Sequence, residues 1–477
     1  MNQSISKFIF QRLSGELKNS SSVSKWRNFY RLNNYYRKEL LKLSSHIIPL
    51  HASIIEFGSK GGELLSALSN KVKVGVEYDA GLISYAKKRH PQTRFIKGDN
   101  LNSLKGRKFD YILLTNILSE VEDIQLFLKE IKKISHADTK IVVFYFNLLW
   151  KPALDLGERL GLKMSLDRQP NWLSVRELEN LFYIESYEVV RWGRSFLVPY
   201  NFGFVSDFVN KYLVPLPLIN NFCLINYSIF RLKPRRKNYS TSVVIPARNE
   251  EGTIRGILQK IPKLGTSTEV IFVEGFSKDN TYLAIKDEIK KYKGPLSLRL
   301  FKGRRRGKGS AVRLGFSKAA GELLMILDAD LTVAPSELPK FYDAASSGLG
   351  DLIIGSRLIY PMDKEAMRFL NYVGNRFFSW AFTFLLGQPI KDTLCGTKVI
   401  LKRDYSKIVK NRKIFADFDP FGDFDLIFGA AKLNLKILEI PVRYRERTYG
   451  KTNISRFEHG LLLLRMLFPA AKKLKFM

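Results

Sequence analysis

An apolar run that ends in two carboxylates constrains this chain more than any other stretch of its sequence. Leu323 to Leu327 is followed at once by Asp328, Ala329 and Asp330. The length of the run and its setting between turns predict a fully buried strand. In α/β proteins, ligands bind at the carboxyl ends of such strands. Two like charges buried there are costly unless a cation shares the site, which indicates Mg²⁺ or Mn²⁺ bridging nucleotide phosphates.

An ordinary acidic turn after the strand is the alternative, because aspartate is common in turns. The preceding segment favours the metal. Residues 302–316, KGRRRGKGSAVRLGF, form a basic loop punctuated by glycines, and five of its first seven residues are Lys or Arg. Its glycines and its place before the strand predict contact with phosphate, although a solvated charge run has the same composition.

The first half of the chain alternates strand and helix patterns from about residue 52. A glycine-rich turn, 58–62, follows the first strand, and Glu77 ends the second at the spacing of a residue that accepts ribose hydroxyls. The succession predicts a doubly wound parallel sheet, closed by an antiparallel pair. The predicted strands are 53–57, 71–77, 94–99, 110–116, 140–146, 187–192 and 222–230.

These motifs resemble those of the class I methyltransferases that use S-adenosylmethionine, over roughly residues 50–232. EFGSKGG, VGVEYD and KGD are similar to the first three motifs of that family. The resemblance implies a Rossmann-like fold in which Glu56, Gly58 and Gly62 border the methionine moiety of the cofactor. It also implies that Glu77 holds the ribose, that Asp99 contacts the adenine and that Asn116 lies where the substrate side begins.

Lys60 stands where the first motif commonly has its middle glycine. This departure keeps a second hypothesis open, in which the N-terminal half is a non-catalytic binding or scaffolding module. Under the first hypothesis the half methylates an unknown substrate, with a glycan as one option.

Seven motifs in the second half resemble the family 2 glycosyltransferases of the GT-A fold. Within that family they are most similar to the dolichol-phosphate mannose synthase-like enzymes, which transfer sugars to polyprenyl phosphates. The motifs keep the family's order over about 210 residues. They are VVIPARNEE, FVEGFSKDNT, GKG, ILDADL, IIGSRL, KDTLCGTKV and EIPVRYRERTYG.

The resemblance implies roles for particular residues. Asp328 and Asp330 would bind the metal, Lys308 would lie near the sugar, Arg357 would face an acceptor phosphate and Arg447 would clamp phosphate. Asp392 lies where many relatives carry an acidic residue near the reacting centre. The implied contacts of the nucleotide sugar are Pro246, Arg248, Glu250, Glu274, Asp279 and Asp328.

Three positions depart from the family pattern. Glu274 stands where Asp is usual, Thr332 replaces a residue that is often Gln, and Asn453 falls where Lys is expected. The acceptor therefore stays open between two classes. A polyprenyl phosphate is already an anionic nucleophile, whereas the hydroxyl of a glycan or small molecule needs a base, for which Asp392 is the candidate.

The charge of the chain predicts a polyanionic partner. Its 78 Lys and Arg against 45 Asp and Glu give a net charge of +33. RNA-binding motifs, zinc fingers and heptads are absent from the sequence, so no nucleic acid is expected and an anionic membrane surface is favoured. Two cysteines, no apolar signal segment and no 18-residue apolar run predict a cytoplasmic protein, peripheral on the cytoplasmic face of the membrane.

The sequence divides into five predicted segments. One amphipathic helix carrying Trp26 to Leu43 is expected in the first, and 367–387 is either core or an element at the membrane interface. The segments are a helical extension (1–49), a methyltransferase-like domain (50–232), an unpacked basic linker (233–240), a GT-A domain (241–454) and a basic amphipathic helix (455–477).

Overall fold

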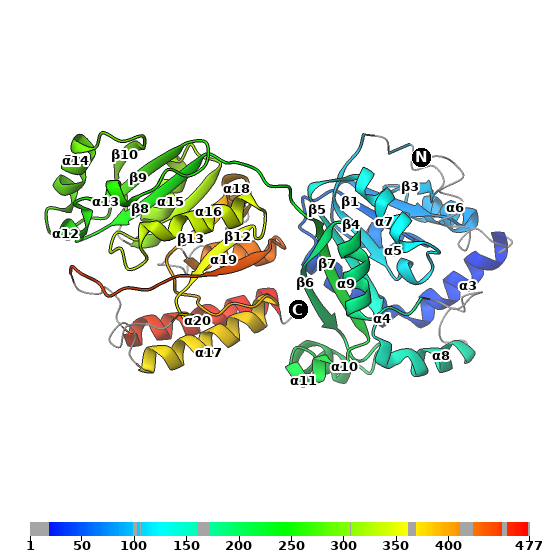
Figure 1. Ribbon diagram of the computed structural model, residues 1–477. Coiled ribbons are helices and arrows are strands. Elements are labelled where there is room, and N and C mark those ends of the chain that lie inside the picture. The colour runs from blue at the N-terminus through cyan, green and yellow to red at the C-terminus, as the bar shows by residue number, and fades with distance from the viewer. Residues whose placement is uncertain are drawn as a thin grey trace. The chain divides into compact units, whose positions relative to one another are not determined.

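The chain forms two compact α/β units, one ending at Lys233 and the next beginning at Pro234. Figure 1 shows each unit as a sheet covered by helices. None of the described helices combines the length and the hydropathy that crossing a bilayer requires. The computed structural model describes residues 19–98, 103–104, 106–160, 171–305, 307–360, 369–410, 423–450 and 456–475.

The described part of the first unit contains a seven-stranded sheet in the order β3-β2-β1-β4-β5-β7-β6. Its first five strands are parallel, and β7 runs antiparallel to both β5 and β6. The strands are β1 (Ile54–Phe57), β2 (Lys73–Glu77), β3 (Arg94–Lys97), β4 (Phe109–Thr115), β5 (Ser135–Phe146), β6 (Tyr187–Ser195) and β7 (Ile225–Leu232). The predicted parallel sheet with a final antiparallel pair is confirmed.

Helices cover both faces of this sheet, as continuous apolar strands require. Ile112 and Leu114 of β4 face one apolar cluster and Leu113 faces the other. The helices, with short 3-10 and π segments labelled η, are α3 (Asn19–Leu32), α4 (Asn34–Ile47), α5 (Glu63–Ala67), α6 (Ala80–Arg89), η2 (Ile117–Ser119), α7 (Ile124–Lys133), η3 (Leu148–Trp150), α8 (Lys151–Arg159), α9 (Val175–Ile184), α10 (Phe204–Phe208), η4 (Val209–Leu213) and α11 (Pro217–Asn220).

The described part of the second unit also contains a seven-stranded sheet, in the order β10-β9-β8-β11-β13-β12-β14. β13 runs antiparallel to its neighbours β11 and β12, which the sequence patterns did not reveal. The strands are β8 (Thr241–Ala247), β9 (Thr268–Glu274), β10 (Ser297–Lys302), β11 (Leu323–Ile326), β12 (Leu352–Ser356), β13 (Lys398–Leu401) and β14 (Ile437–Pro441).

Alternation along β11 explains why this strand is apolar throughout. Leu324 and Ile326 face one apolar cluster, whereas Leu323 and Met325 face the other. Both clusters include helices, so β11 is buried on both sides. The helices are α12 (Glu251–Ile254), α13 (Ile257–Lys260), α14 (Thr281–Lys291), α15 (Lys308–Lys318), η5 (Pro335–Glu337), α16 (Leu338–Ser346), α17 (Phe369–Leu386), α18 (Lys402–Lys410), α19 (Asp423–Lys432) and α20 (Arg456–Leu474).

Two local features differ from the predictions. The single N-terminal helix is two helices, α3 and α4, because Asn33 between them leaves the helical backbone conformation (φ −107°, ψ 33°). The linker packs on the second unit, where the main-chain N of Lys237 donates to Ser346 and its Nζ pairs with Glu322 at 2.8 Å. The C-terminal helix is α20, and its buried Met466 belongs to the apolar core of the second unit.

Candidate active site

Three parallel strands of the second unit end at one edge of the sheet, and the candidate site lies there. β8 lies between β9 and β11 and runs parallel to both. In the loops that follow these three strands, Asn249, Phe276 and Leu331 adopt left-handed backbone conformations with φ from 54° to 61°. Such conformations are disfavoured for residues other than glycine and gather at functional sites.

Asp328 is held by a lysine from the basic loop. Nζ of Lys308, the first residue of α15, lies 2.7 Å from Oδ1 and 3.0 Å from Oδ2 of Asp328. A Cβ atom at position 396 would collide with both side chains, so Gly396 allows them to meet. Lys308 therefore neutralises one of the two carboxylates. Arg306 of the same loop lies outside the described residues.

The Asp330 carboxylate, unlike that of Asp328, is hydrogen-bonded by uncharged groups. Its two hydrogen bonds come from the backbone N and the hydroxyl of Thr332, at 3.2 and 2.9 Å, and both fall on Oδ1. Burial, and next the repulsion of the Asp328 carboxylate, raise the pKa of Asp330. A divalent cation would remove that repulsion and would meet hard oxygen ligands, so these two residues fit Mg²⁺ or Mn²⁺.

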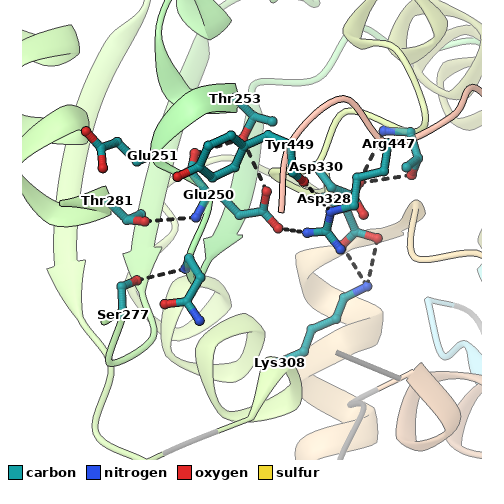
Figure 2. Close-up of polar contacts among 12 residues, drawn as sticks. Glu250, Glu251, Thr253, Ser277, Thr281, Lys308, Asp328, Asp330, Arg447 and Tyr449 are labelled. Carbon is teal, nitrogen blue, oxygen red and sulfur yellow. Dashed lines mark hydrogen bonds and ion pairs between the residues drawn. The ribbon is translucent and has the colours of Figure 1, made fainter. Parts of the chain in front are cut away.

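Glu250, which is buried, and Arg447, which is half-buried, form an ion pair beside the two aspartates (Figure 2). The backbone N of Glu250 donates to the hydroxyl of Thr281 at 2.9 Å, which fixes the loop after β8. Nε of Arg447 donates to the carbonyl of Tyr449 at 2.8 Å. The predicted residues Glu250, Lys308, Asp328, Asp330 and Arg447 are thus brought together, while the supporting roles of Thr281 and Tyr449 were not foreseen.

The other predicted nucleotide contacts surround the same loops. Oε1 of Glu274 accepts a hydrogen bond from the backbone N of Ser277, at 2.6 Å. The Asp279 carboxylate accepts the backbone N of Glu251 at 3.3 Å. Nε of Arg248 is buried and without a hydrogen-bond partner, which leaves a donor for a ligand. Pro246 lies in the last part of β8, one residue before the strand ends.

Arg357 and Asp392 form a separate buried pair. Nε and Nη2 of Arg357 donate to the two oxygens of Asp392 at 2.7 and 2.9 Å, and its backbone N donates at 3.0 Å. The backbone N of Leu394 adds a fourth bond, at 3.1 Å. Burial alone would raise the pKa of Asp392, but the Arg357 guanidinium outweighs it and holds this pKa below its ordinary value. A carboxylate so engaged is a weak base.

The first unit has a comparable edge at the ends of β1, β2 and β4. Gly58 and Gly62 adopt positive φ angles of 70° and 80°, which glycine tolerates. Lys60 also has a positive φ, of 49°, so the turn keeps its shape without the middle glycine. Nζ of Lys60 pairs with Glu120 at 2.8 Å, and its backbone N donates to Oε2 of Glu77 at 2.6 Å.

Two buried glutamates line this edge. Oε1 of Glu56 accepts the hydroxyl of Thr115 at 3.0 Å, whereas Oε2 is buried without a partner. Burial raises the pKa of Glu56 to about 8. A cationic ligand such as the methionine ammonium of S-adenosylmethionine would lower this pKa and pair with the unpartnered oxygen. Asp99, the predicted adenine contact, lies outside the described residues.

A pocket opens at the ends of β4 and β5, beyond Asn116. Asn116 adopts φ 56° and its buried Oδ1 is without a hydrogen-bond partner. Of the described residues that line the pocket, none carries a charge. They are Asn116, Leu118, Ser119, Phe144, Tyr145, Phe146, Asn171, Trp172, Leu173 and Leu178.

Comparison with known families agrees with this division. Residues 242–408 match the family model described as glycosyl transferase family 2, and residues 28–190 match that of a methyltransferase domain. The chain joins these two transferase domains. The glycosyltransferase domain contains both aspartates and Lys308, and the methyltransferase domain contains the glycine turn and Glu77.

Curated relatives match the glycosyltransferase domain. A dolichyl-phosphate hexose transferase of Haloferax volcanii is 29% identical over 222 residues, which are 46% of this chain and 88% of that protein. A dolichol-phosphate mannosyltransferase of Pyrococcus furiosus is 32% identical over 120 residues, which are 25% of this chain and 33% of that protein.

Solved structures match each domain at low similarity. A SAM-dependent methyltransferase of Thermotoga maritima is 18% identical, with a TM-score of 0.35, and the match covers 47% of this chain and 100% of that one. A glucosyl-3-phosphoglycerate synthase of Mycobacterium tuberculosis is 18% identical, with a TM-score of 0.37, and the match covers 50% of this chain and 81% of that one. Scores this low assign no function to the chain.

Proposed function

We propose that the glycosyltransferase domain transfers a sugar from a nucleotide sugar to a polyprenyl phosphate. We choose this acceptor because Asp392, the candidate base for a hydroxyl acceptor, is paired with Arg357. Asp392 is fully buried and accepts four hydrogen bonds, so it is poorly placed to take a proton from a hydroxyl. A lipid phosphate is already anionic and requires no such base. The names of the two relatives, a hexose transferase and a mannosyltransferase, support this class of acceptor.

Charge governs the proposed transfer. Positive charge develops at the anomeric carbon while negative charge develops on the departing diphosphate. Asp328 and Asp330 would hold Mg²⁺ or Mn²⁺, which supplies Lewis-acid stabilisation of that leaving group. Nζ of Lys308 reaches the Asp328 carboxylate and so brings a second cation to the site. The ion pair of Glu250 and Arg447 lies beside the two carboxylates.

Incubation with a panel of nucleotide sugars, Mg²⁺ or Mn²⁺ and either of two matched lipids tests the proposal. Polyprenyl phosphate and the corresponding polyprenol differ only in the phosphate. Mass spectrometry should detect a glycosylated product with the phosphate and none with the alcohol. Equal transfer to both lipids, or transfer only to glycan hydroxyls, would contradict the proposed acceptor.

We further propose that the methyltransferase domain binds S-adenosylmethionine along the edge formed by Glu56, Gly58, Gly62 and Glu77. The unpartnered oxygen of Glu56 and the left-handed glycines support this site. Asn116 and the uncharged pocket beyond it would receive the methyl acceptor, which we infer to be uncharged because none of the described lining residues carries a charge. A net charge of +33 supports peripheral attachment to an anionic membrane.

Glu77→Ala should weaken binding of S-adenosylmethionine by about 1–3 kcal/mol, the cost of losing hydrogen bonds to a charged group. Titration calorimetry on the full chain measures this change. Glu179→Ala, on α9 of the same unit, is the matched control and should leave the affinity unaltered. If the wild-type protein binds neither S-adenosylmethionine nor its demethylated product, the scaffolding hypothesis replaces this proposal.

A further inference from the structure

The first unit carries an exposed apolar surface that neither proposed site uses. It occupies α10, η4, α11 and the residues beside them, at the end of the unit where Figure 1 labels α10 and α11. Exposed fractions run from 41% for Phe208 to 81% for Leu218. We name this surface the apolar patch and define it by Phe202, Phe204, Phe208, Tyr212, Leu218 and Phe222.

The patch is an ordered arrangement of aromatic rings. Phe204, Phe208 and Tyr212 follow one another at four-residue spacing on consecutive helical turns. The ring centroids of Phe204 and Phe208 are 5.7 Å apart, and those of Phe208 and Tyr212 are 5.5 Å apart. A contiguous apolar surface of this kind marks an interaction site far more often than isolated exposed residues do.

Polar side chains of the same segment point inward and hold the backbone. Oδ1 of Asn210 accepts the backbone N atoms of Leu197 and Val198, at 2.9 and 3.0 Å. The fully buried Ser206 donates to the carbonyl of Tyr200 at 2.8 Å. The segment is therefore inverted relative to an ordinary surface loop, with amides and hydroxyls inside and aromatic rings outside. Its outward rings follow from a specific internal bonding pattern.

Charges around the patch favour an anionic lipid surface. Arg194 donates to Asn221, the residue before Phe222, and lies over the exposed ring of Trp192, whereas Lys211 lies over the ring of Tyr212. Oδ1 of Asp207, the acidic residue of α10, accepts the hydroxyl of Tyr35 at 2.9 Å. Aromatic rings with neighbouring cations are suited to the boundary between headgroups and acyl chains.

We propose that the apolar patch inserts into the interface of an anionic lipid bilayer. A net charge of +33 attracts the chain to such a surface but makes two copies of it repel each other, which disfavours a second copy as the occupant. The proposal gives the methyltransferase domain a membrane contact of its own. It requires neither methyl nor sugar transfer, so its test is independent of both proposed activities.

A single introduced cysteine tests the insertion directly. Cys223 and Cys395 are both buried, so an environment-sensitive fluorophore on a Leu218→Cys variant labels the patch selectively. Vesicles of phosphatidylcholine and phosphatidylglycerol should shift its emission to the blue and should expose it to a quencher carried on the lipid tails. Because apolar insertion is not screened, the shift should persist in high salt. A label at Val72→Cys, exposed in the same unit, is the control and should not shift.

Partitioning of a triple variant gives the size of the effect. Phe204→Ser/Phe208→Ser/Leu218→Ser should reduce the vesicle partition coefficient in high salt by about 100-fold, since each side chain contributes about 5-fold. An unchanged coefficient, or no blue shift at position 218, overturns the proposal. In the absence of lipid, a blue shift that grows with protein concentration identifies a second copy as the occupant of the patch. Emission that is already blue in dilute protein shows instead that another part of the same chain covers the patch. Either result also overturns it.

Discussion

Asp330→Asn is expected to lower the rate of sugar transfer by about 100-fold or more while leaving the protein folded. The substitution keeps the shape of the side chain and its acceptor for Thr332 but removes one negative charge from the pair of carboxylates. Stabilisation of a phosphate leaving group by a metal is worth several kcal/mol, and each 1.4 kcal/mol is about tenfold in rate. Steady-state transfer assays measure the loss, and circular dichroism checks the fold.

Asp343→Asn provides the matched control. Asp343 lies on α16 of the same domain, and its side chain is exposed and paired with Arg236 at 3.2 Å. This variant should transfer sugar at the wild-type rate. Transfer by Asp330→Asn at a similar rate would show that the carboxylates after β11 do not serve the reaction.

Arg357→Met should destabilise the glycosyltransferase domain by about 3–5 kcal/mol. The substitution leaves the Asp392 carboxylate fully buried without its cation, and breaking a buried ion pair on one side has that cost. Arg236→Met, which breaks the exposed pair with Asp343, should cost less than about 1 kcal/mol. Denaturant unfolding compares the two variants, and equal losses would contradict a structural role for the Arg357–Asp392 pair.

The same pair predicts a dependence on pH. Arg357 holds the folded-state pKa of Asp392 below its ordinary value. The stabilisation that this shift provides is therefore complete above the ordinary pKa of aspartate, about 4, and is lost as the pH falls through the folded-state pKa. The stability difference between the wild type and Arg357→Met should accordingly shrink in acid.

Much of the architecture could be predicted because strand patterns and strand-end residues are local. The apolar run before Asp328 predicted β11, and the glycine turn after β1 predicted the candidate cofactor site at the edge of the first sheet. The capping box at the start of α9, in which Ser174 and Glu177 bond to each other's backbone, is likewise formed by residues three apart in the sequence. These features depend on neighbouring residues, so the sequence alone carries them.

Pairings between distant residues could not be predicted in this way. Asp392 was a candidate base by position, yet its engagement by Arg357 depends on how β12 and the segment before β13 lie together in space. Lys308 was placed near the sugar, and only the fold brings its Nζ to Asp328. The antiparallel direction of β13 likewise depends on the long connection from β12, which includes α17. No local sequence pattern reports the direction in which a strand enters the sheet.

Calorimetry of nucleotide binding tests the central claim most directly, because it needs no knowledge of the acceptor. The ligands are the nucleoside diphosphates that correspond to the panel of nucleotide sugars, each titrated into the full chain with Mn²⁺ or with chelator. If Asp328 and Asp330 hold the metal that bridges the diphosphate, the wild type should bind much more tightly with Mn²⁺, and Asp330→Asn should lose most of that gain. Equal affinity of the wild type in Mn²⁺ and in chelator would contradict the account.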